Sequence, residues 1–216
     1  MNSAAGRALC TRCARPQRNC ICALARRVDC APEVLILQHP LEVHEAKGTA
    51  RLLHLCLARS RLEIGEQFDE HQLEAWLAQD WQDDADAPRT VLLYPESAPD
   101  PALPLSPAPV LPAEWLQTPA RLRLVVIDGT WRKSRKMLYL NPLLQRLPRL
   151  ALRDLPASRY AIRRAHRPGQ LSTLEAAYCA LAQLEPANGK LEALLQAMDA
   201  LVRREQQWRP QGEGAG

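Results

Sequence analysis

The sequence is poor in aromatic residues and has no long apolar run. Phe, Trp and Tyr make up 5% of its 216 residues, with a single Phe, so we expect a core built mainly from Leu, Ala and Val. No apolar stretch approaches the roughly 18 residues that a membrane-spanning helix needs, and the first residues do not resemble a secretory signal peptide. We therefore expect a cytoplasmic protein with no membrane partner, in which structural disulfides are uncommon.

Two common phosphate-binding motifs, G-x-G-x-x-G and G-x-x-x-x-G-K-S/T, are also missing, which disfavours the standard dinucleotide-binding and P-loop folds. Apolar segments that predict strands nevertheless alternate with predicted helices, which indicates an α/β fold with a largely parallel sheet. Residues 95–119, with eight prolines, and residues 143–170 are expected to be irregular. The predicted strands are residues 34–37, 61–64, 90–94 and 122–127, and the predicted helices are residues 41–58, 71–80, 171–184 and 191–208, with a further basic helix that ends at Asn141-Pro142.

Charge is distributed unevenly along the chain, although the net charge is only +4. Residues 121–167 hold thirteen Lys and Arg against two Asp, and residues 1–30 hold six Arg against one Asp. Residues 60–100, by contrast, hold eleven acidic residues against two Arg. A cationic face opposite an acidic one favours a nucleic-acid partner, although Arg-rich helices can also simply be solvated.

Four cysteines lie within thirteen residues near the amino terminus, in the pattern Cys10-x2-Cys13-x6-Cys20-x-Cys22. Zinc in structural sites takes four soft ligands in a tetrahedron, and a metal would supply folding energy to a segment with little apolar periodicity. The alternatives are a redox C-x-x-C, which would need a thioredoxin-like strand-to-helix junction that is not present, or four free thiols. The sequence therefore predicts a zinc-binding head over residues 1–30, followed by a domain over residues 31–216.

The segment Asp128-Gly129-Thr130-Trp131 joins the predicted strand at residues 122–127 to the basic helix. Ligands of open α/β sheets bind at the carboxyl ends of the strands, and the amino terminus of a helix attracts anions. These four residues are therefore the first candidates for a ligand site. In the alternative interpretation, Asp128 or Thr130 only caps the helix and Trp131 is a core aromatic residue.

Two further loops are expected to reach the same pocket. Residues 93–96 lie at the end of another predicted strand, and the strand-end rule applies to them as well. Ser172, with Glu175 three residues later, forms a capping box at the start of a helix. Free backbone N–H groups at that helix start suit the carboxylate of a small ligand, although an ordinary capped helix has the same sequence.

The segment Gln38-His39-Pro40 ends the strand at residues 34–37 and precedes two cations. His39 is either a substrate contact or a structural histidine in a turn. Lys47 and Arg51 suit phosphate or carboxylate binding, although a solvated helix face explains them equally well.

Taken together and in order, these motifs resemble those of the DTW-domain family, whose bacterial members are tRNA-uridine aminocarboxypropyltransferases. The resemblance implies a fold related to the SPOUT class, with a trefoil knot that holds S-adenosylmethionine. It also implies transfer of the 3-amino-3-carboxypropyl group to N3 of a tRNA uridine, with release of methylthioadenosine. The matching blocks are Cys10/Cys13/Cys20/Cys22, Gln38-His39-Pro40, Lys47-Gly48-Thr49-Ala50-Arg51-Leu52-Leu53, Asp128-Gly129-Thr130-Trp131 and Leu171-Ser172-Thr173-Leu174-Glu175-Ala176.

The resemblance also assigns expected roles to residues. Asp128 would take or orient the N3 proton, and burial would have to raise its pKa if it acts as the base. A SPOUT-like RNA methyltransferase and a non-enzymatic zinc-containing RNA-binding protein are the alternatives. The expected residues are Asp128, Thr130 and Trp131 for catalysis; Leu93, Tyr94, Pro95, Glu96, Asp128, Gly129, Leu171, Ser172 and Thr173 for S-adenosylmethionine; Lys47, Arg51, Arg132, Lys133, Arg135, Lys136, Arg163, Arg164 and Arg167 for tRNA; and Cys10, Cys13, Cys20 and Cys22 for zinc.

Overall fold

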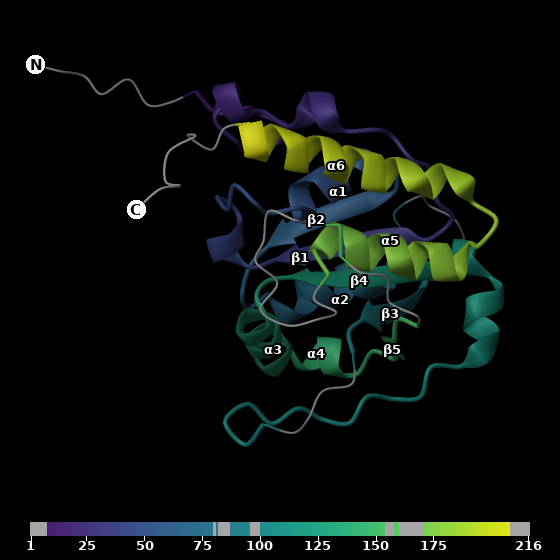
Figure 1. Ribbon diagram of the computed structural model, residues 1–216. Coiled ribbons are helices and arrows are strands. Elements are labelled where there is room, and N and C mark those ends of the chain that lie inside the picture. Colours follow the sequence, from purple (N-terminus) through teal and green to yellow (C-terminus); the bar gives the residue numbers. More distant parts are fainter. Residues whose placement is uncertain are drawn as a thin grey trace, which may run out of the picture.

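The protein contains one five-stranded sheet in which every strand pair is parallel (Figure 1). The computed structural model describes residues 8–79, 81, 87–95, 100–153, 158–159 and 171–207. The strands follow the order β2-β1-β4-β3-β5, which confirms the predicted α/β class. Their bounds are β1 Glu33–Gln38, β2 Ser60–Ile64, β3 Arg89–Leu93, β4 Leu122–Asp128 and β5 Arg149–Leu150.

Helices cover both faces of this sheet (Figure 1). They are α1 Ala50–Cys56, α2 Glu70–Ala78, α3 Trp131–Leu140, α4 Pro142–Gln145, α5 Thr173–Leu184 and α6 Glu192–Gln207, with 3-10 helices at Gln17–Asn19, Cys22–Leu24, Pro40–Glu42, Ala113–Gln117, Pro119–Arg121 and Gly189–Leu191. Val34 and Ile36 pack with α1, α5 and α6, whereas Leu35 and Leu37 pack with α2, α3 and α4. Burial on both faces explains the unbroken apolar run of β1. None of the described helices is long and apolar enough to span a membrane.

The predicted helix at residues 41–58 is wrong in its first half. A 3-10 helix occupies Pro40–Glu42, and the α-helix begins only at Ala50. The reason is local, because the His39 side chain accepts a hydrogen bond from the Leu41 N–H and so caps the 3-10 helix. Such side-chain bonds compete with a continuous helix for the same backbone groups.

The prediction that residues 143–170 are irregular is also wrong in part. They contain most of α4 and the short strand β5. The helix α4 begins at Pro142 because proline fits the first turn of a helix, where its missing N–H is not needed. Residues 154–157 and 160–170, between β5 and α5, lie outside the described residues, and the trefoil knot therefore stays a prediction.

The described part of the cysteine-rich head packs against α1 and α6. Ile21 and Val28 are buried in the same apolar cluster as these helices. Arg204 of α6 also donates hydrogen bonds to the carbonyls of Cys20 and Asn19, at 2.7 and 3.4 Å. The head thus obtains its apolar contacts from the larger part of the chain, and the boundary at residue 30 stays a prediction.

A buried ion pair ties the amino-terminal ends of the two central strands. Arg123 of β4 is fully buried and lies opposite Glu33 of β1, to which it donates two hydrogen bonds. It also donates to the Trp76 carbonyl at 2.7 Å, and its guanidinium lies 4.0 Å from the centroid of the Trp81 ring. Arg59 adds a further contact to Glu33 at 3.4 Å. Each charge of the pair is therefore compensated inside the protein.

Replacing Arg123 with Met should lower the free energy of unfolding by about 3–5 kcal/mol, because the Glu33 carboxylate would lose its main partner while it stays buried. Arg61, whose side chain is 42% exposed, offers a control, and its replacement should cost about 0–1 kcal/mol. Urea unfolding monitored by tryptophan fluorescence measures both effects. Equal losses for the two variants would contradict the structural role given to Arg123.

Candidate active site

The candidate site lies where β1 and β4 end, at the point where the connections of the sheet change direction. From β1 the chain goes on to β2 on one side, and from β4 it goes on to β5 on the other. Open α/β sheets bind their ligands at such a switch point. Here the last residues of the two strands, Gln38 and Asp128, lie opposite each other, and the Gln38 Nε2 donates to Asp128 Oδ2 at 2.9 Å.

Asp128 receives a second hydrogen bond from the start of α5. The Thr173 hydroxyl donates to Asp128 Oδ1 at 2.5 Å, so both carboxylate oxygens have donors. Asp128 is only 5% exposed, and a buried carboxylate needs hydrogen-bond donors of this kind. Segments that are far apart in the sequence therefore hold one acceptor group in a fixed orientation.

The first turn of α5 is held by side chains from two segments. Ser172 and Glu175 form the predicted capping box. The Leu174 N–H donates to the buried hydroxyl of Thr49, at 3.2 Å, and this hydroxyl does not cap its own helix α1. Ser172 is itself buried and also donates to the sulfur of Met198. Ser172 and Thr173 are both predicted to bind the cofactor. Of these two residues, it is therefore Thr173 whose side chain contacts Asp128.

Trp131 and Tyr94 form an aromatic stack beside Asp128. Their ring centroids lie 5.3 Å apart with 16° between the planes. Tyr94 is buried, and burial raises the pKa of its phenol, whereas Trp131 is 50% exposed. The inner face of Trp131 thus rests on Tyr94, and much of the side chain is available to stack on a planar ligand. Thr130, which is exposed, caps α3 by accepting a bond from the Lys133 N–H at 3.4 Å.

His39 has a structural arrangement at the edge of this site. Its Nδ1 accepts from the Leu41 N–H, so its Nε2 carries the proton and donates to Glu66 at 3.0 Å. Lys136 also donates to Glu66, at 2.9 Å, and together these two donors lower the pKa of the Glu66 carboxyl. Of the two interpretations of His39, the structure thus supports the structural histidine in a turn.

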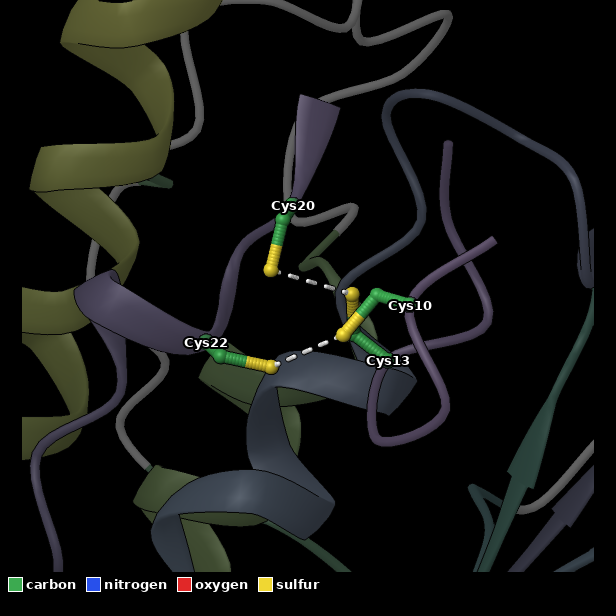
Figure 2. Close-up of side chains that lie close together, drawn as sticks. All are labelled: Cys10, Cys13, Cys20 and Cys22. Carbon is green, nitrogen blue, oxygen red and sulfur yellow. Dashed lines mark hydrogen bonds between the residues drawn. The ribbon is translucent and has the colours of Figure 1, made fainter. Parts of the chain in front are cut away.

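The four cysteines of the head point their sulfur atoms toward one another (Figure 2). All four Sγ atoms lie within 4.8 Å of one another, with Cys10 to Cys22 at 3.6 Å and Cys13 to Cys20 at 3.8 Å. A tetrahedral zinc ion with Zn–S bonds of about 2.3 Å separates its sulfur ligands by about 3.8 Å. The geometry therefore fits a metal held by these residues. Cys30 has a different environment, because its thiol donates to the Pro32 carbonyl.

The profile of the DTW domain matches residues 7–206 of the chain. The chain belongs to the DTW domain family. It is 32% identical to tRNA-uridine aminocarboxypropyltransferase 2 from Mus musculus over 89% of its length, and 32% identical to the protein of that name from Drosophila melanogaster over 90%. It is 26% identical to tRNA-uridine aminocarboxypropyltransferase A from Arabidopsis thaliana over 91%. The chain spans 61%, 73% and 80% of these three relatives. No solved structure matches it significantly.

The predicted tRNA-binding cations of this DTW domain lie in different environments. Arg132 and Lys47 are exposed. Lys133 and Lys136 are partly exposed and pair with the carboxylates of Glu42 and Glu66. Four other predicted site residues, Glu96, Arg163, Arg164 and Arg167, lie outside the described residues.

Two of the predicted cations do not belong to an exposed basic surface. Arg135 is 5% exposed, and its guanidinium contacts Asp100 at 3.5 Å and the Leu103 carbonyl at 3.1 Å. It therefore anchors the Pro-rich segment to α3. Arg51 is partly buried; burial lowers its pKa, and the charge of Cys13 opposes this shift. Arg51 is therefore a partly buried residue whose charge interacts with Cys13 of the cysteine cluster.

Sequence reasoning missed three residues that shape the site. Gln38 holds Asp128, Thr49 holds the start of α5, and Glu66 holds His39. The strand-end rule that selected Asp128 applies equally to Gln38, which ends the adjacent strand. Thr49 stands in one of the blocks that resemble the DTW family, but that block assigns no role to its hydroxyl. Glu66 has no comparable signal, because its partners lie far away in the sequence.

Replacing Cys10 with Ser should remove most of the bound metal and lower the melting temperature, because a structural zinc site needs all four thiolates. Cys179 on α5, which lies outside the cluster, serves as the control for the loss of a thiol. Elemental analysis of the purified protein gives the metal content, and thermal unfolding gives the stability. A wild-type protein without metal, or a Cys10 variant with normal metal content, would contradict the assignment.

Proposed function

We propose that this DTW domain transfers the 3-amino-3-carboxypropyl group from S-adenosylmethionine to N3 of a tRNA uridine. In this reaction a bond forms between N3 and the methylene carbon next to the sulfonium, the carbon–sulfur bond breaks, and methylthioadenosine leaves with the electron pair. The names of the relatives support the reaction class. The observation that carries the proposal within the chain is the buried Asp128 carboxylate, held between Gln38 and Thr173 at the switch point of the sheet.

Asp128 suits a ligand that brings a hydrogen-bond donor. The N3–H of uridine is such a donor, and a fixed, ionised carboxylate would hold the base with N3 facing the acceptor or accept its proton as it leaves. Cytidine has no hydrogen on N3, so the same carboxylate would disfavour it. The donors from Gln38 and Thr173 fix the direction of the Asp128 carboxylate, which supports a role in orienting the uridine.

The residues around Asp128 also suit S-adenosylmethionine. The Gln38 Oε1 is buried and has no hydrogen-bond partner among the described residues, and a buried acceptor of this kind is costly unless a ligand supplies a donor. The ammonium of the cofactor is a donor of the required type. Trp131 and the exposed Pro95 would contact a planar ring, while Leu93 and Tyr94 support them from the core. When bound, the cofactor supplies the electrophilic methylene, and Gly129 allows the backbone to approach closely.

The cysteine cluster and the basic residues complete the proposal. Zinc held by Cys10, Cys13, Cys20 and Cys22 would have a structural role, because four thiolates leave no open position for a substrate. The tRNA backbone would contact the cations that reach the surface near the site, and phosphates would compete with Glu42 and Glu66 for Lys133 and Lys136. These contacts position the RNA and carry no sequence information.

S-adenosylmethionine labelled either in the carboxyl carbon or in the methyl group tests the reaction. Purified protein incubated with unmodified tRNA should transfer the carboxyl label to tRNA and leave the methyl label in methylthioadenosine. Asp128→Asn should lower this transfer by about 100-fold or more, whereas Asp29→Asn, at an exposed position, should leave it unchanged. Transfer of the methyl label would instead identify a methyltransferase, and transfer of neither label would leave a binding protein.

A further inference from the structure

The cysteine-rich head is connected to the candidate site through Arg15. This residue follows Cys13 by two positions, and its backbone carbonyl accepts a hydrogen bond from the Cys10 N–H at 2.8 Å. Its side chain is nearly buried and leaves the head, where it donates to the Gly48 carbonyl at 2.9 Å. A second nitrogen lies 3.9 Å from Glu205 of α6. The position of Arg15 thus depends directly on the fold of the cysteine cluster.

Gly48 lies in a tight turn immediately before Thr49. The Gly48 N–H donates to the Glu45 carbonyl at 2.8 Å, and a Cβ at Gly48 would lie only 3.1 Å from that same oxygen. Thr49 is 2% exposed, and its hydroxyl accepts the Leu174 N–H. A shift of this turn would therefore move the hydroxyl away from the start of α5.

The start of α5 in turn holds the carboxylate. Leu174 directly follows Thr173, whose hydroxyl donates to Asp128 at 2.5 Å. A continuous chain of hydrogen bonds and adjacent residues thus runs from the cysteine cluster through Arg15, Thr49 and Thr173 to Asp128. The side chains of Arg15, Thr49 and Asp128 are nearly or fully buried, so water does not readily replace a lost bond there.

We propose that Arg15 is a positioning residue for Asp128, and that the cysteine-rich head stabilises the geometry of the reaction centre through it. The role does not require contact between the head and the substrate. Only the activity measurements rest on the proposed function. The chain of contacts can be tested without it, by hydrogen exchange.

Arg15→Ala tests the proposal against a matched control. Arg204→Ala removes another anchor of the head, at the carbonyls of Cys20 and Asn19. Arg204 shares the Glu205 carboxylate with Arg15 at 3.8 Å, but the hydrogen bond to the Gly48 carbonyl comes from Arg15. Hydrogen exchange followed by mass spectrometry should show faster exchange at the amino end of α5 in the Arg15 variant only. With normal metal content, kcat for transfer should fall about 10- to 100-fold, since small misplacements at a reaction centre have effects of this size, while KM for tRNA stays near the wild-type value. Arg15→Lys, which keeps a positively charged nitrogen that can donate to the Gly48 carbonyl, should recover part of the activity.

A second pair of variants keeps the test decisive if Arg15→Ala fails to fold or loses its metal. Thr49→Val removes the hydroxyl and keeps the shape, whereas Thr49→Ser keeps the hydroxyl. Thr49→Val should reproduce the faster exchange and the loss of kcat, and Thr49→Ser should not. In the double variant, the effects of Arg15→Ala and Thr49→Val should add to less than their sum, because both break the same path.

The results separate the two proposals. Wild-type exchange at α5 in both Arg15→Ala and Thr49→Val, or equal effects of Arg15→Ala and Arg204→Ala, would overturn the role of Arg15. A wild-type protein that transfers no group from S-adenosylmethionine would overturn the proposed function and leave the exchange result to decide the inference alone.

Discussion

The pairing of β1 with β4 is the constraint on which the candidate site depends. The parallel register puts Gln38 opposite Asp128 at the carboxyl edge of the sheet, where their side chains hydrogen-bond. Because side chains alternate between the two faces of a strand, a slip of one residue would turn one of them away. At the other end of the same register, the buried pair of Arg123 and Glu33 opposes such a slip. The buried ion pair and the candidate catalytic carboxylate are thus linked by the same two strands.

The helices that follow the strands complete the site with hydroxyl groups. Thr173 donates to Asp128, and Thr49 accepts from the first turn of α5. A buried carboxylate is costly without donors, so these bonds both stabilise Asp128 and fix its direction. An acceptor fixed before the substrate binds needs no reorganisation during the reaction. The DTW motif at residues 128–131 therefore depends on two motifs that lie far from it in the sequence.

Sequence patterns predicted the features that depend on residues close together in the sequence. The apolar runs indicated the strands, the Ser172 and Glu175 spacing indicated the capping box, and the strand-end rule indicated Asp128. The register of β1 and β4 could not be predicted, because it depends on contacts 90 residues apart. Charge alone also could not separate Arg132, which is exposed, from Arg135, which is buried against the Pro-rich segment. A 3-10 helix at Pro40–Glu42 replaces the start of the expected α-helix, because the His39 side chain caps it and this local bond outweighs helix propensity.

The direction of the Asp128 carboxylate depends on its two donors, and of these Thr173 can be changed with the least effect on the sheet. Thr173→Val keeps the shape of the side chain and removes the hydroxyl, whereas Thr173→Ser keeps the hydroxyl. The measurement is kcat for transfer of the carboxyl-labelled group to tRNA, together with the Kd of S-adenosylmethionine from calorimetry. Thr173→Val should lower kcat by about 10-fold or more with a smaller change in Kd, whereas Thr173→Ser should stay near wild type. A wild-type kcat in Thr173→Val would rule out the orienting role of the Thr173 hydroxyl.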